Sequence, residues 1–317
     1  MKKVRAAVIG VGYLGKFHAQ KYAKMENVDL VAVVDSNKEQ AEAIAGTVGV
    51  RALTKYPDLF GRVDAVSIAV PTPLHFEIGK AFLEQGIDVL MEKPITTTVE
   101  EADELIAIAD SKRLVFQVGQ LERFNPAVAA VQHIVDHPIF IESNRLGIYK
   151  ERGTDVSVVL DLMIHDIDII LNFVRSPIKY SHAMGASVVS DNIDIANAHI
   201  EFENGAVANV TASRISNKNE RKIRLFQKNG YISLDFANRS IIHVRPGNED
   251  NNCPIPGMHL EEKCFTDGDA LEDEIRSFIH AVENRKAPEV SGQMGRDALK
   301  IALNITRQIR ESSKVYA

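Results

Sequence analysis

Cysteine is scarce in this sequence. Only two cysteines, Cys253 and Cys264, occur among 317 residues. Two thiols cannot build a disulfide framework, and no C-x-x-C pair is present to indicate a zinc site. His133 and His137 are four residues apart, but no carboxylate or third nitrogen follows them at the spacing of metal ligands. We therefore expect two free thiols in a reducing compartment and no bound metal.

Long apolar runs and basic blocks are also missing. No run approaches the ~18 apolar residues of a membrane span. Lys2, Lys3 and Arg5 precede the apolar stretch Ala6–Gly15 as in a signal peptide, but glycines interrupt that stretch and no clean cleavage site follows. The net charge of −6 gives no reason to expect nucleic acid or an anionic membrane as a partner. We expect a soluble cytoplasmic protein.

The length of the chain favours two domains, and its pattern changes near residue 121. Up to that point, short and almost continuously apolar runs alternate with amphipathic stretches, which predicts a doubly wound parallel sheet of the Rossmann type. The predicted strands are Val4–Ile9, Asp29–Val34, Asp64–Val70, Ile87–Met91 and Leu114–Val118. The predicted helices are Leu14–Met25, Lys38–Ala45, Leu74–Gln85 and Val99–Ala109.

Residues 122–317 have the pattern of an α+β domain. A helix is expected over about Val156–Val174, a loop over Pro246–Cys264, and two helices over Ala270–Asn284 and Gln293–Glu311, of which the last could pack back on the first domain. Polar and apolar residues alternate in between, with Asn-Gly turn signals at Gly205 and Gly230. The strands expected there are Ala196–Glu203, Ala206–Ile215, Ile223–Lys228, Tyr231–Asp235 and Ser240–Arg245. This predicts a mainly antiparallel sheet with one face open to solvent or to a partner subunit.

A glycine-rich turn follows the first predicted strand and begins the first predicted helix. Its glycines are Gly10, Gly12 and Gly15, with Tyr13 and Leu14 between the last two. In a dinucleotide-binding turn, the first glycine permits the tight turn, the second admits the pyrophosphate and the third lets helix and strand pack closely. The second predicted strand leads into Asp35, where an acid can bind ribose hydroxyls.

That acid also bears on the choice of dinucleotide. The carboxylate of Asp35 would repel a 2′-phosphate, and Ser36 and Asn37 beside it supply no cation. The sequence thus predicts NAD in preference to NADP.

Two further segments carry candidate chemistry. Lys93 lies in Glu92-Lys93-Pro94 after a predicted strand, and the proline holds it extended or in a turn. A cis Lys93–Pro94 bond would direct its ammonium group toward the cleft. In the second half, Asp161, His165 and Asp168 would share one face of an apolar helix, where polar groups are costly unless they face a polar cleft.

In this order, the glycine turn, Asp35, Glu92-Lys93-Pro94 and Asp161-x3-His165 resemble the Gfo/Idh/MocA oxidoreductase superfamily along essentially the whole chain. The resemblance implies that Lys93 and His165 carry catalysis around a nicotinamide and a sugar or cyclitol, with Asp161 on substrate hydroxyls. It also implies a cofactor role for Glu92 and for the turn after the third predicted strand. That turn contains Pro71, Thr72 and His75.

Segments 119–126 and 155–166 look like the UDP-N-acetylglucosamine 3-dehydrogenase branch of that family. The resemblance implies oxidation of a ring hydroxyl, at C3 of a nucleotide-linked amino sugar, by NAD. We take Arg123 as a candidate ligand of a substrate diphosphate and Asn125 as one of an acetamido group, with a helix-start salt bridge as the structural alternative for Arg123. Either His165 or Lys93 can be the base.

Three other functions remain open. The chain could act on another sugar, a cyclitol or a tetrapyrrole. It could be an NAD-using glycosidase, or a binding protein that senses NAD without turnover. As in relatives, a homodimer or homotetramer is expected.

Overall fold

The computed structural model describes residues 3–150, 156–247 and 253–313. The chain divides into two compact units. The first combines the chain up to residue 121 with residues 269–299, and the second combines residues 122–268 with the chain from residue 300 onward. Residues 269–299 therefore lie with the first unit, whereas the sequence predicted a second domain over residues 122–317 from which only the last helix could pack back on the first.

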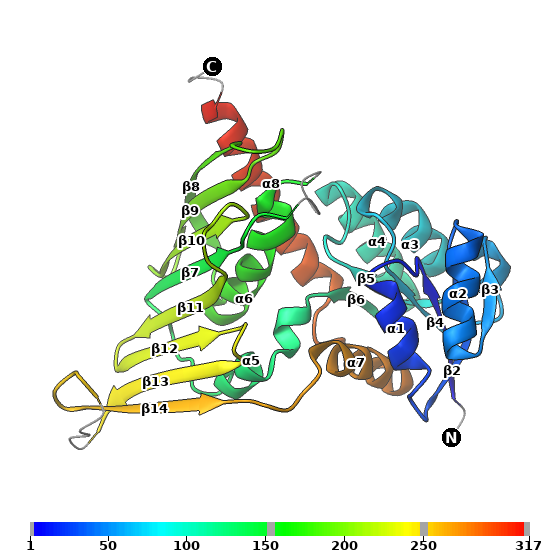
Figure 1. Cartoon of the computed structure of the whole chain (residues 1–317), viewed down its shortest axis with the longest axis horizontal. Helices are drawn as coiled ribbons and strands as arrows, with labels where there is room; N and C mark the ends of the chain where they lie inside the picture. Colours follow the sequence, from blue (N-terminus) through cyan, green and yellow to red (C-terminus); the bar gives the residue numbers. More distant parts are fainter. Residues whose placement is uncertain (1–2, 151–155, 248–252, 314–317) are drawn as a thin grey trace. The chain divides into compact units, whose positions relative to one another are not determined.

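The first unit contains a six-stranded parallel sheet in the order β3-β2-β1-β4-β5-β6 (Figure 1). Its strands are β1 (Val4–Ile9), β2 (Val28–Val34), β3 (Arg51–Leu53), β4 (Ala65–Ile68), β5 (Asp88–Glu92) and β6 (Phe116–Gly119). The order reverses between β1 and β4, and doubly wound sheets bind their ligands beyond the carboxyl ends of the strands at such a point. The five predicted strands are confirmed. The edge strand β3 was not predicted, because three residues are too few to show a pattern.

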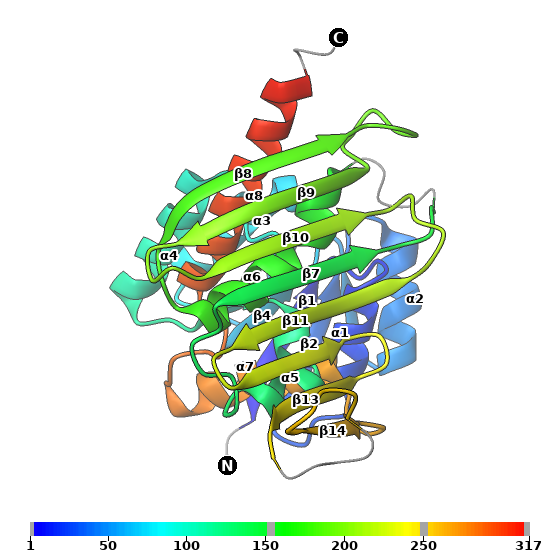
Figure 2. The ribbon, with the colours of Figure 1, turned by 90° about the vertical axis from the view of Figure 1, so that its left-hand side faces the viewer.

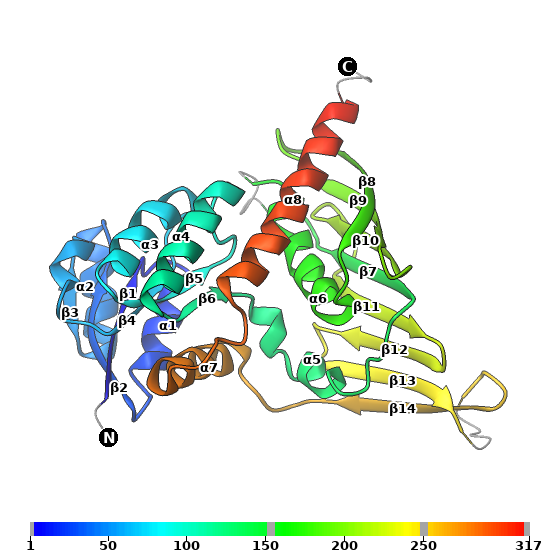
Figure 3. The same ribbon diagram turned by 180° about the vertical axis from the view of Figure 1, so that it is seen from behind.

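Helices cover both faces of this sheet. They are α1 (Gly15–Tyr22), α2 (Lys38–Val48), α3 (His75–Glu84), α4 (Val99–Lys112) and α7 (Ala270–Asn284). Helices α1 and α2 lie on one face with α7 beside α1 (Figure 1), and α3 and α4 lie side by side on the other (Figure 3). Three of them begin with a side-chain cap, and the cap of α7 is Asp269, which accepts from the backbone N–H of Glu272. Asn37 accepts from the backbone N–H of Gln40, and Thr98 and Glu101 form a capping box on α4.

Helix α7 completes the core of the first unit. Its fully buried residues Ile275, Phe278 and Ile279 pack in the same cluster as Val8 of β1 and Tyr22 of α1. Each such side chain contributes about 1.5–3 kcal/mol by leaving water. The burial explains why a segment distant in sequence belongs to the nucleotide-binding fold.

The second unit contains an eight-stranded sheet in the order β14-β13-β12-β11-β7-β10-β9-β8. Its strands are β7 (Phe140–Leu146), β8 (Ile178–Ala186), β9 (Ile195–Phe202), β10 (Val207–Ser213), β11 (Glu220–Gln227), β12 (Gly230–Asp235), β13 (Ser240–Pro246) and β14 (Met258–Cys264). Within this sheet, as far as the described residues form it, β7 and β10 are the one pair of parallel strands. The sheet is thus mainly antiparallel, as predicted.

Three strands of this sheet were not predicted. The loop expected over Pro246–Cys264 was wrong in its second part, because Met258–Cys264 forms β14 and pairs with β13; residues 248–252 lie outside the described chain. β14 is an edge strand with few buried side chains, so it lacks the apolar alternation by which a strand is recognised. Strands β7 and β8 were also missed.

Helices lie on one face of the eight-stranded sheet, and the other face is turned to the viewer in Figure 2. The helical elements of this unit are α5 (Pro126–Val131), the π-helix Val159–Met163 and α6 (Ile164–Val174). The last helix, α8 (Gly292–Ser313), belongs to the second unit from residue 300 onward. Across both units, none of the helices in the described ranges has the length and apolar character needed to cross a membrane.

We expect acid to remove one specific source of stability in the second unit. The buried carboxylate of Asp194 accepts hydrogen bonds from the backbone N–H groups of Val188, Val189 and Ser190 and from the Ser190 hydroxyl. Burial raises the pKa of Asp194, but these bonds outweigh it and lower the pKa to about 2. The stabilisation is therefore present above the unfolded pKa near 4 and lost as the pH falls toward about 2. Asp194→Asn should cost about 2 kcal/mol at neutral pH, by urea unfolding.

The exposed Asp191 in the same loop supplies the control, because Asp191→Asn should leave the unfolding free energy unchanged. The cost of Asp194→Asn should shrink as the pH is lowered from about 7 to about 3. A cost that is the same at every pH would contradict the assignment.

Candidate functional site

The glycine turn at the carboxyl end of β1 has the geometry of a binding turn. Gly10 adopts a φ of +80°, which favours glycine, and a Cβ on Gly15 would lie 1.8 Å from the carbonyl oxygen of Gly10. By contrast, a Cβ on Gly12 would meet nothing within 4 Å. Tyr13 and Leu14 are exposed beside it. The first and third glycines thus serve the close packing of strand and helix, and the second faces open space.

Asp35 follows β2 at the same edge of the sheet. Its carboxylate accepts hydrogen bonds from the backbone N–H groups of Val11, at 3.0 Å, and Asn37, at 2.9 Å. A carboxylate has about four lone-pair sites, so two remain for a ligand. The side-chain amide of Gln40 also donates to the carbonyl of Val11 at 2.7 Å. Together these bonds hold the acid against the glycine turn.

His75 joins the turn after β4 to the turn after β5. The imidazole is buried, with Nδ1 2.9 Å from the Pro94 carbonyl and Nε2 2.9 Å from the Val70 carbonyl. Burial lowers the pKa of His75 despite these two acceptors, so the neutral ring donates to one of them at a time. Both ring nitrogens are occupied by the protein backbone, so His75 supports the cofactor turn from behind. Pro71 and Thr72, which precede it, are at least partly exposed.

Lys93 comes directly after β5 and is half-buried. Its backbone N–H donates to Oε2 of Glu92 at 3.3 Å, and its peptide bond to Pro94 is cis. Oε1 of Glu92 lies 3.0 Å from Nε2 of the buried His18. The Glu92 carboxylate therefore contacts both α1 and the turn that carries Lys93.

In the second unit, Asp161 and His165 lie where a π-helix meets an α-helix. Asp161 belongs to the π-helix Val159–Met163, and His165 is the second residue of α6. The sequence predicted one regular helix here. π-Helical turns are rare and occur frequently at functional sites. Both side chains are half-buried, whereas most of their neighbours are fully buried, so this pair remains the candidate for substrate chemistry.

Asp168 and Arg123 form a separate, buried ion pair. The Arg123 guanidinium donates to both carboxylate oxygens of Asp168, at 2.5 and 3.2 Å, with side chains 3% and 2% exposed. Burial raises the pKa of Asp168, and Arg123 partly offsets that effect. The structure thus favours the salt bridge over diphosphate binding for Arg123, and it pairs Asp168 with that arginine in the core, whereas Asp161 and His165 are only half-buried.

The neighbouring polar residues also have structural partners. Arg145 donates to both oxygens of Asp166 and to Glu122, a network that sequence reasoning missed. Asn125 caps α5 by accepting from the backbone N–H of Ala127, and its amide donates to the Phe236 carbonyl. Asn125 is 6% exposed, so the proposed contact with an acetamido group is replaced by this capping role.

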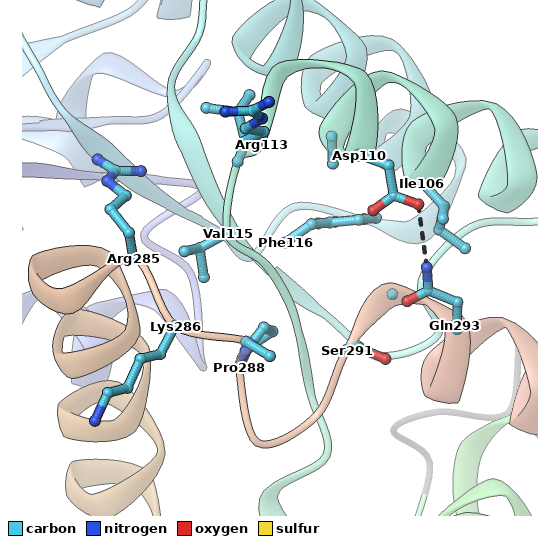
Figure 4. Close-up of a pocket in the computed structure, with 14 residues that line it drawn as sticks. Ile106, Asp110, Arg113, Val115, Phe116, Arg285, Lys286, Pro288, Ser291 and Gln293 are labelled. Carbon is cyan, nitrogen blue, oxygen red and sulfur yellow. Dashed lines mark hydrogen bonds between the residues drawn. The ribbon is translucent and has the colours of Figure 1, made fainter.

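A cavity of about 300 Å³ in the first unit lies away from these residues (Figure 4). Val115 and Phe116, at the amino end of β6, line it together with Arg113, Pro288 and Ser291. Because the strands are parallel, the glycine turn, Asp35 and Lys93 lie at the opposite edge of the sheet. The cavity is therefore distinct from the cofactor site.

Comparison with known proteins identifies the family to which the chain belongs. Residues 4–120 match the family described as "Oxidoreductase family, NAD-binding Rossmann fold", and residues 130–233 match the "GFO/IDH/MocA C-terminal domain". The chain is 37% identical over 306 residues to UDP-N-acetylglucosamine 3-dehydrogenase from Acidithiobacillus ferrooxidans, covering 96% of this chain and 97% of the relative. This chain belongs to the GFO/IDH/MocA oxidoreductase family.

Solved structures of family members agree. A structure of the Acidithiobacillus ferrooxidans enzyme matches with a TM-score of 0.93 and 36% identity, covering 98% of both chains. Levoglucosan dehydrogenase, solved with NADH and levoglucosan, matches with a TM-score of 0.88 at 19% identity, over 98% of both chains, which shows the shared fold. A scyllo-inositol 2-dehydrogenase (NAD(+)) from Bacillus subtilis is 25% identical over 99% of this chain and 96% of its own. The predicted family and fold class are confirmed.

The first unit of this GFO/IDH/MocA protein fits NAD. The open space at Gly12 admits a pyrophosphate, the start of α1 presents backbone N–H groups, and Asp35 has acceptor sites left for ribose hydroxyls. The NAD-binding character predicted from the glycine turn agrees with the family match.

Gly12 and Gly15 allow a matched test, because a methyl group would have space at one and none at the other. Gly12→Ala should keep the wild-type melting temperature, because its methyl meets no protein atom, but should weaken NADH binding at least about tenfold by filling the pyrophosphate space. Gly15→Ala should lower the melting temperature instead, because its methyl would collide with the Gly10 carbonyl. Fluorescence titration and thermal unfolding separate the two effects. Equal NADH affinity in Gly12→Ala and wild type would refute the role of the turn.

A second test concerns Arg123. Arg123→Met leaves the Asp168 carboxylate buried without its partner and should cost about 3–5 kcal/mol in urea unfolding. The double variant Arg123→Met/Asp168→Leu should recover much of that loss, since no buried charge remains. If Arg123 instead served substrate binding, the single variant would unfold like the wild type and only KM would rise.

Proposed function

We propose that this enzyme oxidises the C3 hydroxyl of UDP-N-acetylglucosamine, or of a related nucleotide sugar, to a ketone with NAD. The observation that carries the proposal is the 37% identity, over nearly the whole of both chains, to an enzyme of that name. The residues of the predicted reaction are all present in this chain: Lys93, Asp161 and His165.

We assign the cofactor to the carboxyl edge of the six-stranded sheet. Asp35 binds the adenosine ribose, and the glycine turn and the start of α1 bind the pyrophosphate. Glu92 ends β5, and Lys93 lies on the turn that follows, which His75 links to the turn containing Pro71 and Thr72. Bound NAD supplies the acceptor for the hydride that leaves the sugar carbon.

The protein's own side chains handle the hydroxyl proton. Asp161 accepts a hydrogen bond from a substrate hydroxyl, which orients the ring, and one of Lys93 and His165 removes the proton from the reacting oxygen. If His165 is the base, the ammonium of Lys93 stabilises the negative charge that develops on that oxygen. The pH profiles of Lys93 and His165 variants distinguish the two assignments.

We further propose a cytoplasmic homodimer or homotetramer that associates through the open face of the eight-stranded sheet. On β8, Ser181 faces α8, where Asn304 and Gln308 bond to it. The alternation of strand side chains places Tyr180 and Met184 on the other face, and they are 52% and 53% exposed. On the next strand the same face carries polar side chains, among them Asn197 and Glu201, so the surface offered to a second copy is mixed, with exposed apolar groups on β8.

The activity is tested by incubating the protein with NAD and UDP-N-acetylglucosamine and following NADH absorbance. Wild type should produce NADH, and Lys93→Met should lower kcat by at least about 100-fold with NAD affinity nearly unchanged. The exposed Lys24 provides the control, because Lys24→Met should retain wild-type kcat.

Inositols and free sugars serve as competing substrates in the same assay. Faster turnover of any of these than of the UDP-sugars would overturn the substrate assignment. An active Lys93→Met enzyme would remove Lys93 from the mechanism.

A further inference from the structure

Behind the turn that carries Lys93, the first unit buries a cluster of polar side chains that the reaction does not use. This buried cluster consists of His18 on α1, Glu92 at the end of β5, Gln117 on β6 and Glu274 on α7. One nitrogen of His18 and one oxygen from each of Glu92 and Glu274 lie within 4.8 Å of one another. His18 and Glu274 are each 1% exposed. Two carboxyl groups and one imidazole thus share a space from which water is largely excluded.

The two carboxyl groups have unequal surroundings. Glu92 has partners that favour its charged form: Nε2 of His18 at 3.0 Å and the backbone N–H of Lys93 at 3.3 Å. Neither carboxyl oxygen of Glu274 has a hydrogen-bond partner among the described residues. A charged carboxylate buried without donors costs several kcal/mol, so such a group keeps its proton instead.

Apart from His18, which bonds to Glu92, the described groups around Glu274 offer it no positive charge. The hydroxyl of Tyr22 on α1 bonds to Ser67 of β4 at 2.7 Å, and the side-chain amide of Gln117 donates to the backbone carbonyl of Glu274 rather than to its carboxyl group. Burial raises the pKa of Glu274 well above its ordinary value, and the charge of Glu92 raises it further. For Glu92, burial is outweighed by His18 and Lys93, which lower its pKa.

We propose that Glu274 is a positioning residue for Lys93: it remains a neutral carboxylic acid, so that Glu92 carries the negative charge of the buried cluster and holds the backbone of Lys93. If Glu274 lost its proton, two negative charges would lie close together in the core, and their repulsion would displace the Glu92 carboxylate. Glu92 would then hold the Lys93 N–H less firmly. The inference rests on the proposed function of Lys93.

The first test needs no substrate. Because the folded protein holds the Glu274 proton more tightly than the unfolded chain, this group makes wild type progressively less stable as the pH rises above the unfolded pKa near 4.5. Glu274→Gln imitates the neutral acid and does not titrate. As the pH rises above about 5, its melting temperature should therefore gain on that of wild type by roughly 3 °C per pH unit, until Glu274 ionises in the folded protein.

The control is Glu283→Gln, which replaces an exposed glutamate on the same helix and should show no such gain. A pH-independent difference between Glu274→Gln and wild type would overturn the proposal. So would a stoichiometric metal ion in the purified protein, because a cation would then balance the charge.

The second test measures how the protonation of Glu274 affects the activity that depends on Lys93. At pH values high enough to ionise Glu274 in the folded protein, which the first test locates, the kcat of Glu274→Gln should exceed that of wild type by at least about threefold, with KM unchanged. A parallel pH profile in the two enzymes would show that Glu274 is structural only. If no sugar is turned over, the proposed function fails, but the melting-temperature test still decides the protonation of Glu274.

Discussion

A methyl group on Gly15 would lie 1.8 Å from the carbonyl oxygen of Gly10, so the first helix and the first strand meet with no room for a side chain. This close approach sets where α1 begins and therefore where its free N–H groups point. It also places His18, one turn further along α1, against Glu92. The turn that offers N–H groups for a dinucleotide and the support behind Lys93 thus depend on the same backbone contact.

Buried carboxyl groups in this protein are balanced either by a cation or, at Glu274, by a proton. In the second unit, each buried acid near the candidate substrate residues has an arginine: Asp168 has Arg123, and Asp166 has Arg145. Such pairs contribute little net stability, but removing one partner is costly, so they fix the geometry of α6. In the first unit, a proton rather than a cation balances Glu274. Lys93, Asp161 and His165, by contrast, are only half-buried.

The sequence predicted the parts of the fold whose pattern is strong and local. The parallel strands, the glycine turn and α7 follow from apolar runs, spacing and amphipathic period. β14 was missed because an edge strand buries few side chains and therefore shows no apolar alternation. The π-helix was missed because an inserted residue changes the helical period without changing the amino-acid composition. Arg123 and Asn125 were candidate ligands because sequence shows residue type but not burial. Contacts between residues far apart in the sequence, such as those of His18, Glu92 and Glu274, leave no local pattern by which they could be predicted. The sequence offers one hint, because His18 and Glu274 are polar residues on helix faces that are otherwise buried.

The central claim is that a hydride passes from C3 of the sugar to the nicotinamide. It is tested most directly with UDP-N-acetylglucosamine carrying deuterium at C3. The account predicts NADH with one deuterium at C4 of the nicotinamide ring, detected by mass spectrometry and NMR, together with a ketone at C3 of the sugar. NADH formed without deuterium, or a ketone at another carbon, would contradict it.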